Sequence, residues 1–409
     1  MKKLSAVFKH FTALLLAAIL AGAAFGCDME NINYGDTDNS EKYGSPVEFE
    51  GAPHEARVFF VNVGKADCAV VEVDGHAWLV DTGTEDSFIN TYAALELMGV
   101  ESLDGVILTH EHDDHIGGLD PISKRFPIGS AYYPEFVLDG AKIEAAAYVA
   151  GAPTHTVKAG DSIPITEGAA FEVLAPSERI EGDGNDNSLV ARLTVNGRTF
   201  LFTGDMQTAE DGRLLGSGAD ISCDVLKVPN HGNDDATSAE FASAADPLIA
   251  VISTDTNVDH NSANPKVIAR LEGAEIRLTQ KYELGILMEV SERGEISLSF
   301  PERPAALSGA EIVSASKDAQ TLELRNDTES ELDVSGWFVY STKGHEVLSF
   351  PEGTIIAPGG TLLVACKSSY RLDEADVVWD QKKVWADKKE DRAVLCDPFG
   401  NKISEKLSE

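Results

Sequence analysis

Positive charge is scarce in this chain. Lys and Arg total 33 against 68 Asp and Glu, so the formal net charge is -35 over 409 residues. A protein that holds nucleic acid through phosphate contacts alone needs a basic face. The composition therefore argues against tight non-specific binding of nucleic acid, and plain solubility is the simplest meaning of the acidic surface. A nuclease is not excluded, because bound cations can supply positive charge locally.

Cysteine is also scarce, with five residues in the chain. No Cys-x-x-Cys pair is present, so neither a zinc ribbon nor a dithiol redox site is indicated. Cys366 and Cys396 both lie in strand-like segments near the C-terminus. Outside the cytoplasm these two can form a disulfide, although spacing alone does not establish the pairing.

One long apolar run stands near the N-terminus, at residues 11–25. It follows a basic start made by Lys2, Lys3 and Lys9. A basic start and an apolar run of this length predict a secretory signal peptide rather than a stable membrane span. The mature protein is therefore expected outside the cytoplasm.

The apolar run closes on Ala24-Phe25-Gly26-Cys27, where small residues precede a cysteine. This resembles a bacterial lipobox, although Leu, Val or Ile is usual where Ala24 stands. The resemblance predicts a lipoprotein signal peptide over residues 1–27, with Cys27 lipidated and the protein anchored to the membrane. An ordinary cleaved signal, which would give a secreted protein, is the alternative.

The rest of the chain divides into three parts. Residues 28–55 are polar and acidic without apolar periodicity, which predicts a flexible tether. Residues 56–300 mix strands and helices and predict an α/β domain. Residues 307–409 consist of short strands separated by turn residues, which predicts an all-β sandwich. In the α/β domain we expect a helix over 88–98, closed by Gly99, and strands at 57–63, 68–73, 77–80, 106–108, 171–174, 189–195, 199–203, 225–228 and 248–253.

Residues 109–118 read THEHDDHIGG and bring three His and two Asp into a run of six, in a chain with only ten His. His110 and His112 stand two apart at a strand end, so both rings can face one ion. Asp114 and His115 follow where a helix is expected to begin, between Ile116 and Leu119, and can face a second ion. Imidazole and carboxylate ligands suit Zn, Mn or Fe. The alternative is a polar surface loop.

Two further residues follow apolar strands. Residues 201–204 read LFTG and end in Asp205, whose carboxylate is suited to bridging two ions. Residues 225–228 read VLKV and precede Pro229-Asn230-His231-Gly232. Taken alone, Asp205 would be interpreted as a turn residue and His231 as a structural histidine. Beside the histidine-rich motif, each becomes a candidate metal ligand.

The order FFVNVGKADCAVVEV, WLVDTG, THEHDDHIGG, NDNSLV, FLFTGD, KVPNHG resembles the metallo-β-lactamase fold, and more narrowly the ComEC-type competence nuclease branch. The resemblance covers about residues 56–300. It implies a four-layer αββα sandwich with one or two divalent ions, Zn or Mn. By position, His110 and His112 would serve one ion. The other ion would be held by Asp114, His115 and His231; Asp205 would bridge the two, and both Asp would orient the attacking hydroxide.

The chain departs from the superfamily pattern between the motif and Asp205, where another His ligand is usual. Here residues 185–188 read NDNS, as in the competence branch, which implies that Asn187 and Ser188 line the site for substrate; a turn is the alternative for Asn187. Asn230 and Asn264 stand where the branch commonly has His, which puts the metal affinity of one site in doubt. Lys65 stands where the branch tends to have Gln.

The C-terminal part, from about Leu307 to the end, resembles a lamin tail domain, which has an immunoglobulin-like sandwich. The resemblance rests on Ser335-Gly336-Trp337 and on Ala357-Pro358-Gly359-Gly360. Bacterial examples tend to accompany secreted hydrolases. The partner of this domain is not indicated by the sequence.

The sequence thus predicts a membrane-anchored, extracytoplasmic phosphodiesterase that cuts DNA through a metal-activated water. DNA or another phosphodiester is the expected substrate. One alternative is a small-molecule metallo-hydrolase that acts on β-lactams, lactones or small phosphodiesters. Another is a non-catalytic surface binding module.

Overall fold

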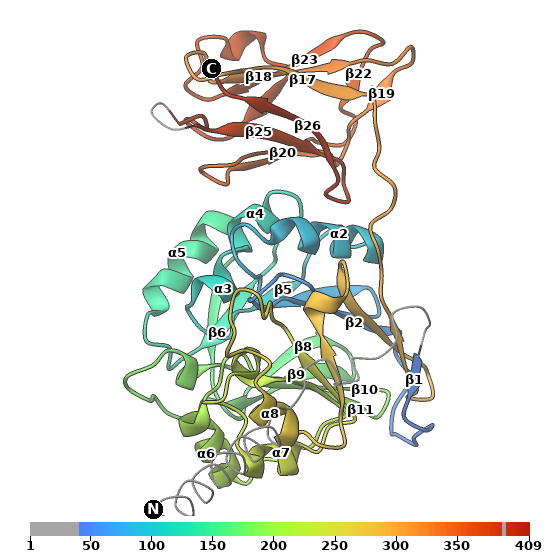
Figure 1. Ribbon diagram of the computed structural model, residues 1–409, viewed down its shortest axis with the longest axis vertical. Coiled ribbons are helices and arrows are strands. Elements are labelled where there is room, and N and C mark those ends of the chain that lie inside the picture. Colours follow the sequence, from blue (N-terminus) through green and yellow to red (C-terminus); the bar gives the residue numbers. More distant parts are fainter. Residues whose placement is uncertain (1–40, 387–389) are drawn as a thin grey trace, which may run out of the picture. The chain divides into compact units, whose positions relative to one another are not determined.

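The computed structural model describes residues 41–386 and 390–409 (Figure 1). The predicted signal peptide, residues 1–27, and its lipidation site Cys27 lie outside the described residues. Within the described ranges, no helix combines the length and the apolar character needed to cross a bilayer.

Two β-sheets form the centre of the first domain in the described part of the chain. The order of the nine-stranded sheet is β1 (Glu41–Tyr43), β16 (Ile296–Ser299), β15 (Gly285–Val290), β2 (Ala56–Val61), β3 (Ala69–Val73), β4 (His76–Val80), β5 (Gly105–Ile107), β6 (Ala131–Pro134) and β7 (Thr154–Val157). The order of the seven-stranded sheet is β14 (Glu275–Leu278), β13 (Ile249–Ile252), β12 (Val225–Lys227), β11 (Arg198–Phe202), β10 (Val190–Val195), β9 (Ala169–Ala175) and β8 (Ser162–Thr166). Neighbours β4 to β7 run parallel, and so do β11 to β14.

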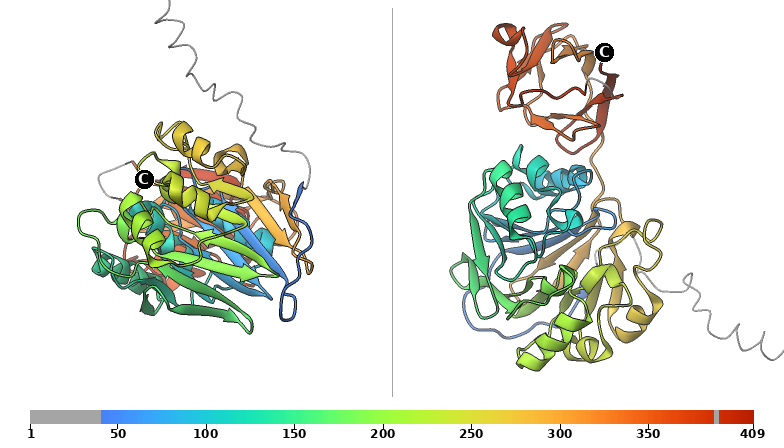
Figure 2. Two further views of the ribbon diagram at one scale, coloured as in Figure 1. Left: turned by 90° about the horizontal axis from the view of Figure 1, so that it is seen from below. Right: turned by 90° about the vertical axis from the view of Figure 1, so that its left-hand side faces the viewer.

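Helices cover the outer faces of both sheets, so the predicted αββα order is confirmed (Figures 1 and 2). The nine-stranded sheet is covered by α2 (Phe88–Met98), α4 (Leu119–Ser123) and α5 (Gly140–Ala150). The helices on the other side are α6 (Thr208–Ser217), α7 (Ala239–Ala245) and α8 (Pro265–Arg270). Helix α2 has the predicted bounds, and Gly99 closes it in the left-handed conformation with φ 71°.

Strand β2 shows why its sequence, ARVFFV, has no clear alternation of apolar and polar residues. Val58 and Phe60 point into the core between the two sheets. Phe59 and Val61 point to the opposite face, where they pack in the core beneath α2. A strand buried on both faces reads as a continuous apolar run. The apolar residues on both faces of β2 therefore indicate that a helix layer covers the outer face of its sheet.

The prediction of a flexible tether over residues 28–55 is wrong in part. Glu41–Tyr43 forms β1, which pairs antiparallel with β16 at the edge of the nine-stranded sheet. Arg277 is buried and contacts both Glu41 and the Tyr43 hydroxyl. The buried Arg277 and the edge of β16 hold this short polar strand in place. It therefore forms without an apolar pattern of its own.

The helix predicted to begin near Ile116 begins earlier and is interrupted. Helix α3 (Asp113–Ile116) is a single turn. Gly117 and Gly118 separate it from α4. Gly118 packs directly on the backbone of Thr82, whose hydroxyl and amide both donate to the carbonyl oxygen of His115 at 2.9 and 2.7 Å. The break thus fixes the histidine-rich turn against the end of β4.

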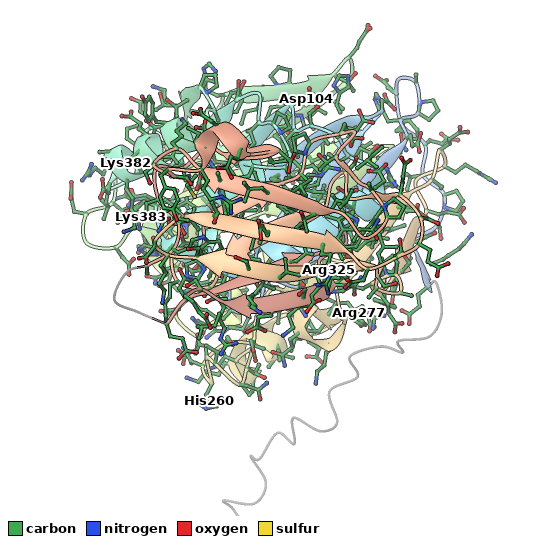
Figure 3. All side chains as sticks on the ribbon, turned by 90° about the horizontal axis from the view of Figure 1, so that it is seen from above. Asp104, His260, Arg277, Arg325, Lys382 and Lys383 are labelled. Carbon is green, nitrogen blue, oxygen red and sulfur yellow. The ribbon has the colours of Figure 1, made fainter. Side chains whose placement is uncertain are left out.

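The C-terminal domain is the predicted β-sandwich. One sheet contains β17 (Ala310–Ser316), β18 (Thr321–Asn326), β23 (Thr361–Cys366) and β24 (Val377–Trp379). The other contains β21 (Val347–Ser349), β20 (Phe338–Ser341), β25 (Arg392–Cys396) and β26 (Lys402–Leu407), and a small ribbon pairs β19 (Leu332–Asp333) with β22 (Ile355–Ile356). Trp337 lies in the core between the sheets, with Trp379 and Trp385. Lys382 and Lys383 are exposed (Figure 3). Arg325 pairs with Glu311 and Asp327.

The pairing of Cys366 with Cys396, which the sequence left open, does not occur: both are buried free thiols. Cys366 points into the core of the sandwich. Cys396 points away from that core and packs with Phe338 against Phe88 and Tyr92 of α2. The two cysteines stand on different sheets and face different cores, so their sulfurs do not meet.

We predict that Gly118→Ala destabilises the first domain by about 1–3 kcal/mol, because the added Cβ would overlap the Thr82 carbonyl oxygen. The backbone φ of Gly118 is -76°, so the cost comes from packing rather than from the dihedral angle. Gly212→Ala is the matched control: it lies in α6, no atom lies within 4 Å of its Cβ position, and alanine favours a helix. Chemical denaturation measures both variants. Equal stability of the two would contradict the prediction.

Candidate metal centre

The candidate site lies where strands of the two sheets end. Asp81 follows β4, the histidine-rich turn follows β5, and Asp205 follows β11. His231 follows β12, within the 3₁₀ turn η3 (Pro229–Gly232). Strands β4, β5, β11 and β12 belong to the parallel parts of the sheets. The carboxyl ends of parallel strands are where α/β sheets place their ligands.

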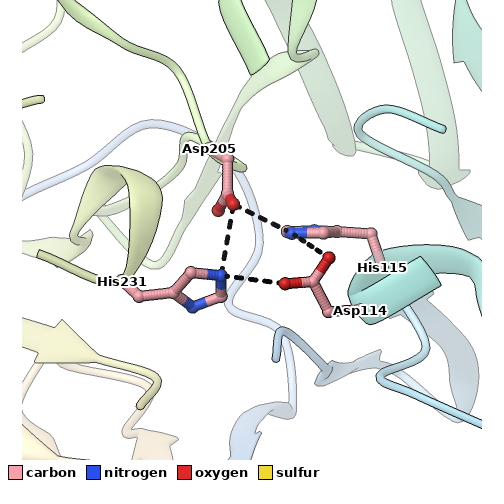
Figure 4. Close-up of side chains that lie close together, drawn as sticks. All are labelled: Asp114, His115, Asp205 and His231. Carbon is pink, nitrogen blue, oxygen red and sulfur yellow. Dashed lines mark ion pairs between the residues drawn. The ribbon is translucent and has the colours of Figure 1, made fainter. Parts of the chain in front are cut away.

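Four of the six predicted ligands converge on one point (Figure 4). One atom of each of Asp114, His115, Asp205 and His231 lies within 4.8 Å of the others. Oδ2 of Asp205 lies 3.2 Å from Nε2 of His115 and 3.1 Å from Nε2 of His231. Asp114 lies on the other side of both rings, with Oδ2 3.5 Å from Nε2 of His231. The predicted second ion would therefore have two imidazoles and two carboxylates.

The other two predicted ligands, His110 and His112, form a pair beside this group. Nε2 of His110 lies 3.0 Å from Nδ1 of His112. The His110 ring is buried and lies 4.1 Å from the His115 ring, centroid to centroid, while His112 is partly exposed. The role of His110 and His112 as metal ligands stays a prediction.

Sequence reasoning missed a second layer of charged residues beneath these ligands. Asp81 accepts from Nδ1 of His115 at 2.8 Å, which turns Nε2 toward the site. Lys227 is 5% exposed, pairs with Asp67 and donates to the Gly204 carbonyl oxygen at 3.0 Å. Such groups orient the ligands of a metal and tune its affinity. The lysine in the apolar strand VLKV could have indicated this layer, because a buried cation requires an acidic partner nearby.

Lys65, in the loop after β2, is also part of the site. Its Nζ donates to Oδ2 of Asp114 at 2.8 Å, and the side chain is 28% exposed. Burial lowers the pKa of Lys65, but the hydrogen bond and charge of Asp114 outweigh it, so the pKa is raised. The ammonium group therefore stays charged at the rim of the site, where the competence branch tends to have a neutral glutamine.

Burial and the carboxylates have opposite effects on the histidines. Burial lowers the pKa of His115, but Asp205 and Asp81 outweigh it and hold that pKa well above its ordinary value. Burial also lowers the pKa of His231, but Asp205 and Asp67 outweigh it and raise that pKa to about 9. A metal ion must displace these protons, so metal binding should strengthen as the pH rises. At His110, burial and the charge of His115 hold the pKa well below the ordinary value.

The two residues predicted to line the site for substrate have structural contacts. The side-chain oxygen of Asn187 accepts from the backbone N–H of Ile180. Its side-chain nitrogen donates to the carbonyl oxygens of Ile180 and Asp183, at 2.8 and 3.1 Å. Ser188 accepts from the Asp205 amide at 3.1 Å, and its Oγ lies 3.5 Å from Nδ1 of His110. Both side chains are fully buried, so each holds the site in shape and neither offers a free surface.

The two asparagines that replace familiar histidines also have local partners. Asn230 is buried with φ 46° and donates to Asp235 at 3.0 Å. Asn264 caps α8, where its side chain accepts from the Lys266 amide at 3.0 Å. The group of Asp114, His115, Asp205 and His231 thus forms with asparagine at both positions.

The donor atoms fit a divalent ion. Nε2 of His115, Nε2 of His231 and Oδ1 of Asp205 are buried and make no hydrogen bond. Buried polar atoms without a hydrogen bond are rare and need an explanation, such as an ion. Two imidazole nitrogens with carboxylate oxygens suit Zn, Mn or Fe.

The sequence profile of the metallo-beta-lactamase superfamily matches residues 61–256, and that of the lamin tail domain matches residues 304–406. The chain carries a metallo-beta-lactamase domain and a lamin tail domain. Both resemblances seen in the sequence are thereby confirmed. With the His and Asp group above, the first domain has the fold and the ligand types of a metal-dependent hydrolase.

Curated relatives match the first domain. "ComE operon protein 3" of Bacillus subtilis is 30% identical over 196 residues, which are 47% of this chain and 25% of the relative. "Competence protein ComA" of Neisseria gonorrhoeae is 31% identical over 205 residues, 49% of this chain and 27% of the relative. These matches support the competence branch. They span only about a quarter of the relatives' own length.

The metallo-beta-lactamase fold protein YhfI of Bacillus subtilis aligns with 57% of this chain and 99% of its own, at a TM-score of 0.41 and 16% identity.

Next to the metal centre, Glu210 provides a pH-dependent prediction. Its side chain is 1% exposed and Oε2 has no hydrogen-bond partner, and burial raises its pKa from 4.5 to about 8. Between these values the folded chain holds a proton that the unfolded chain has lost, so this residue's contribution to stability is lost as the pH rises through about 8. We expect Glu210→Gln to raise the melting temperature relative to wild type at about pH 9 but not at about pH 4, by about 2–4 °C per kcal/mol.

Thermal unfolding followed by circular dichroism across that pH range measures the difference. Glu240→Gln is the matched control, because Glu240 is exposed on the neighbouring helix α7. A constant gap between Glu210→Gln and wild type at all pH values would contradict the assignment.

Proposed function

We propose that this chain is an extracytoplasmic, metal-dependent phosphodiesterase that cuts DNA. The observation that carries the proposal is the buried group of Asp114, His115, Asp205 and His231 within a metallo-beta-lactamase domain. One relative is named a competence protein, which supports DNA as the substrate. The predicted lipidation of Cys27 supports a site of action at the outer side of a membrane.

The chemistry divides between the ion and the chain. A bound divalent ion activates water near neutral pH and neutralises charge on phosphoryl oxygens. Asp205 lies between His115 and His231, with Oδ2 within 3.2 Å of both, and can orient the attacking water. Asp114, on the opposite side of the rings, shares that role. His110, whose low pKa keeps it neutral, offers a lone pair rather than a proton.

Lys65 is suited to binding the substrate phosphate. Its ammonium group is partly exposed at the rim and adjoins Asp114. An ammonium ion binds phosphate as a point charge. On a chain with a net charge of -35, such local cations must offset the repulsion between protein and DNA.

The test is cleavage of double- and single-stranded DNA by the purified full chain with Mn, Mg or Zn. We expect His112→Ala and Asp114→Ala each to lower the rate by at least about a hundredfold. His76→Ala is the matched control, because His76 lies at the opposite end of β4 from Asp81 and pairs with Asp104 at 3.0 Å. It should cleave like wild type.

Other outcomes would redirect the proposal. Metal-loaded protein that leaves DNA intact but hydrolyses a chromogenic β-lactam, a lactone or a small phosphodiester would identify a small-molecule hydrolase. Protein that neither retains metal nor hydrolyses any of these substrates would identify a binding module. Cleavage that persists in both His112→Ala and Asp114→Ala would reveal a contaminating nuclease.

A further inference from the structure

We infer that the two halves of the metal centre are unequal: one divalent ion binds tightly to Asp114, His115, Asp205 and His231, and a second binds much more weakly to His110 and His112. The inference rests on the metal centre of the proposed function, but it does not depend on DNA being the substrate. It concerns how many ions this chain retains and which residues retain them.

The tight half has a full set of protein ligands. Its four donor residues lie within 4.8 Å of one another, and three of the four are buried. Nδ1 of His115 is bonded to Asp81 and Nδ1 of His231 to the Ser253 carbonyl oxygen, both at 2.8 Å. These contacts aim both Nε2 atoms at the same point. Four preoriented protein ligands are typical of sites that close around an ion.

The weak half has two donors. Among the described residues, His110 and His112 belong to no group of three or more His, Cys, Asp or Glu whose ligand atoms lie within 4.8 Å of one another. Asn187, in the segment where another His is usual, has its amide fully bonded to Ile180 and Asp183. Ser188 lies at the Nδ1 edge of His110, whereas the edge that faces His112 is Nε2. Water would have to complete a coordination shell here.

Formal charge also favours a single tight ion. Asp67, Asp81, Asp114 and Asp205 contribute four negative charges, and Lys65 and Lys227 contribute two positive charges. With neutral imidazoles, one divalent cation brings the total to zero. A second would leave a charge of plus two among these residues, or plus one when the buried Glu111 next to His112 is included, in a largely buried site where uncompensated charge is costly. Lys65 adds one of the positive charges in this count, with its ammonium 2.8 Å from Asp114.

Metal counting tests the inference without any substrate. The full chain is stripped with a chelator, loaded with excess Zn or Mn, dialysed, and analysed for metal by mass spectrometry; the stripped chain is also titrated by calorimetry. We expect about one retained ion per chain and a second, weaker binding step. His112→Ala should retain about one ion, whereas His231→Ala and Asp114→Asn should lose the tight step. Circular dichroism verifies that each variant is folded.

Lys65→Gln tests the charge argument separately. Removing the ammonium without removing a ligand should strengthen the second step by roughly tenfold or more, as expected for a unit charge nearby at an effective dielectric constant of ~20. Lys65→Arg, which keeps the charge, is the matched control and should leave the affinity of the second metal-binding step unchanged.

Three results would overturn the inference. They are two equally tight ions in the wild type, loss of the tight step in His112→Ala, and no retained ion in the folded wild type. An unchanged second step in Lys65→Gln would refute the role of charge. None of these results involves DNA, so they are distinct from a failure of the proposed nuclease activity.

Discussion

The structure depends on one constraint: four carboxylates, Asp67, Asp81, Asp114 and Asp205, are held close together at the ends of strands from both sheets. Carboxylates in such a place repel one another and must be compensated. Lys227 lies beneath them and Lys65 beside them. The remaining excess of negative charge holds protons on His115 and His231, or a divalent ion in their place. The two-sheet fold provides the rigid strand ends on which this arrangement relies.

Much of this was predictable from the sequence, because the informative residues stand next to apolar strands. The strand that ends in Asp205 and the strand before His231 both read as buried runs, and the motif at 109–118 follows a third. Parallel strands bring their ends together, so three separate signals meet at one site. Helix α2 was equally clear, because Gly99 marks its end with a left-handed residue.

What the sequence did not show depends on distant partners. Asp67 sits in a turn and Asp81 at a strand end, where acidic residues are common. Strand β1 consists of three polar residues that are ordered by Arg277 and by the edge of β16, more than two hundred residues away. Cys366 and Cys396 are both in strands, but only the packing shows that they face different cores. Local patterns carry no trace of such contacts, because burial and pairing are set by the tertiary fold.

An acidic chain can act on DNA because electrostatic repulsion between distant charges is screened by salt. At physiological salt, charges farther apart than about 8 Å are largely screened. The net charge of -35 therefore slows the approach of DNA but does not decide what happens in contact. Within contact distance, the local balance of charge governs binding, and at the rim that balance includes Lys65 beside an ion. In the roles proposed for it, the Lys65 ammonium would bind a substrate phosphate and would also oppose a second ion. Affinity for an anionic substrate and affinity for a second metal would then oppose each other in this site.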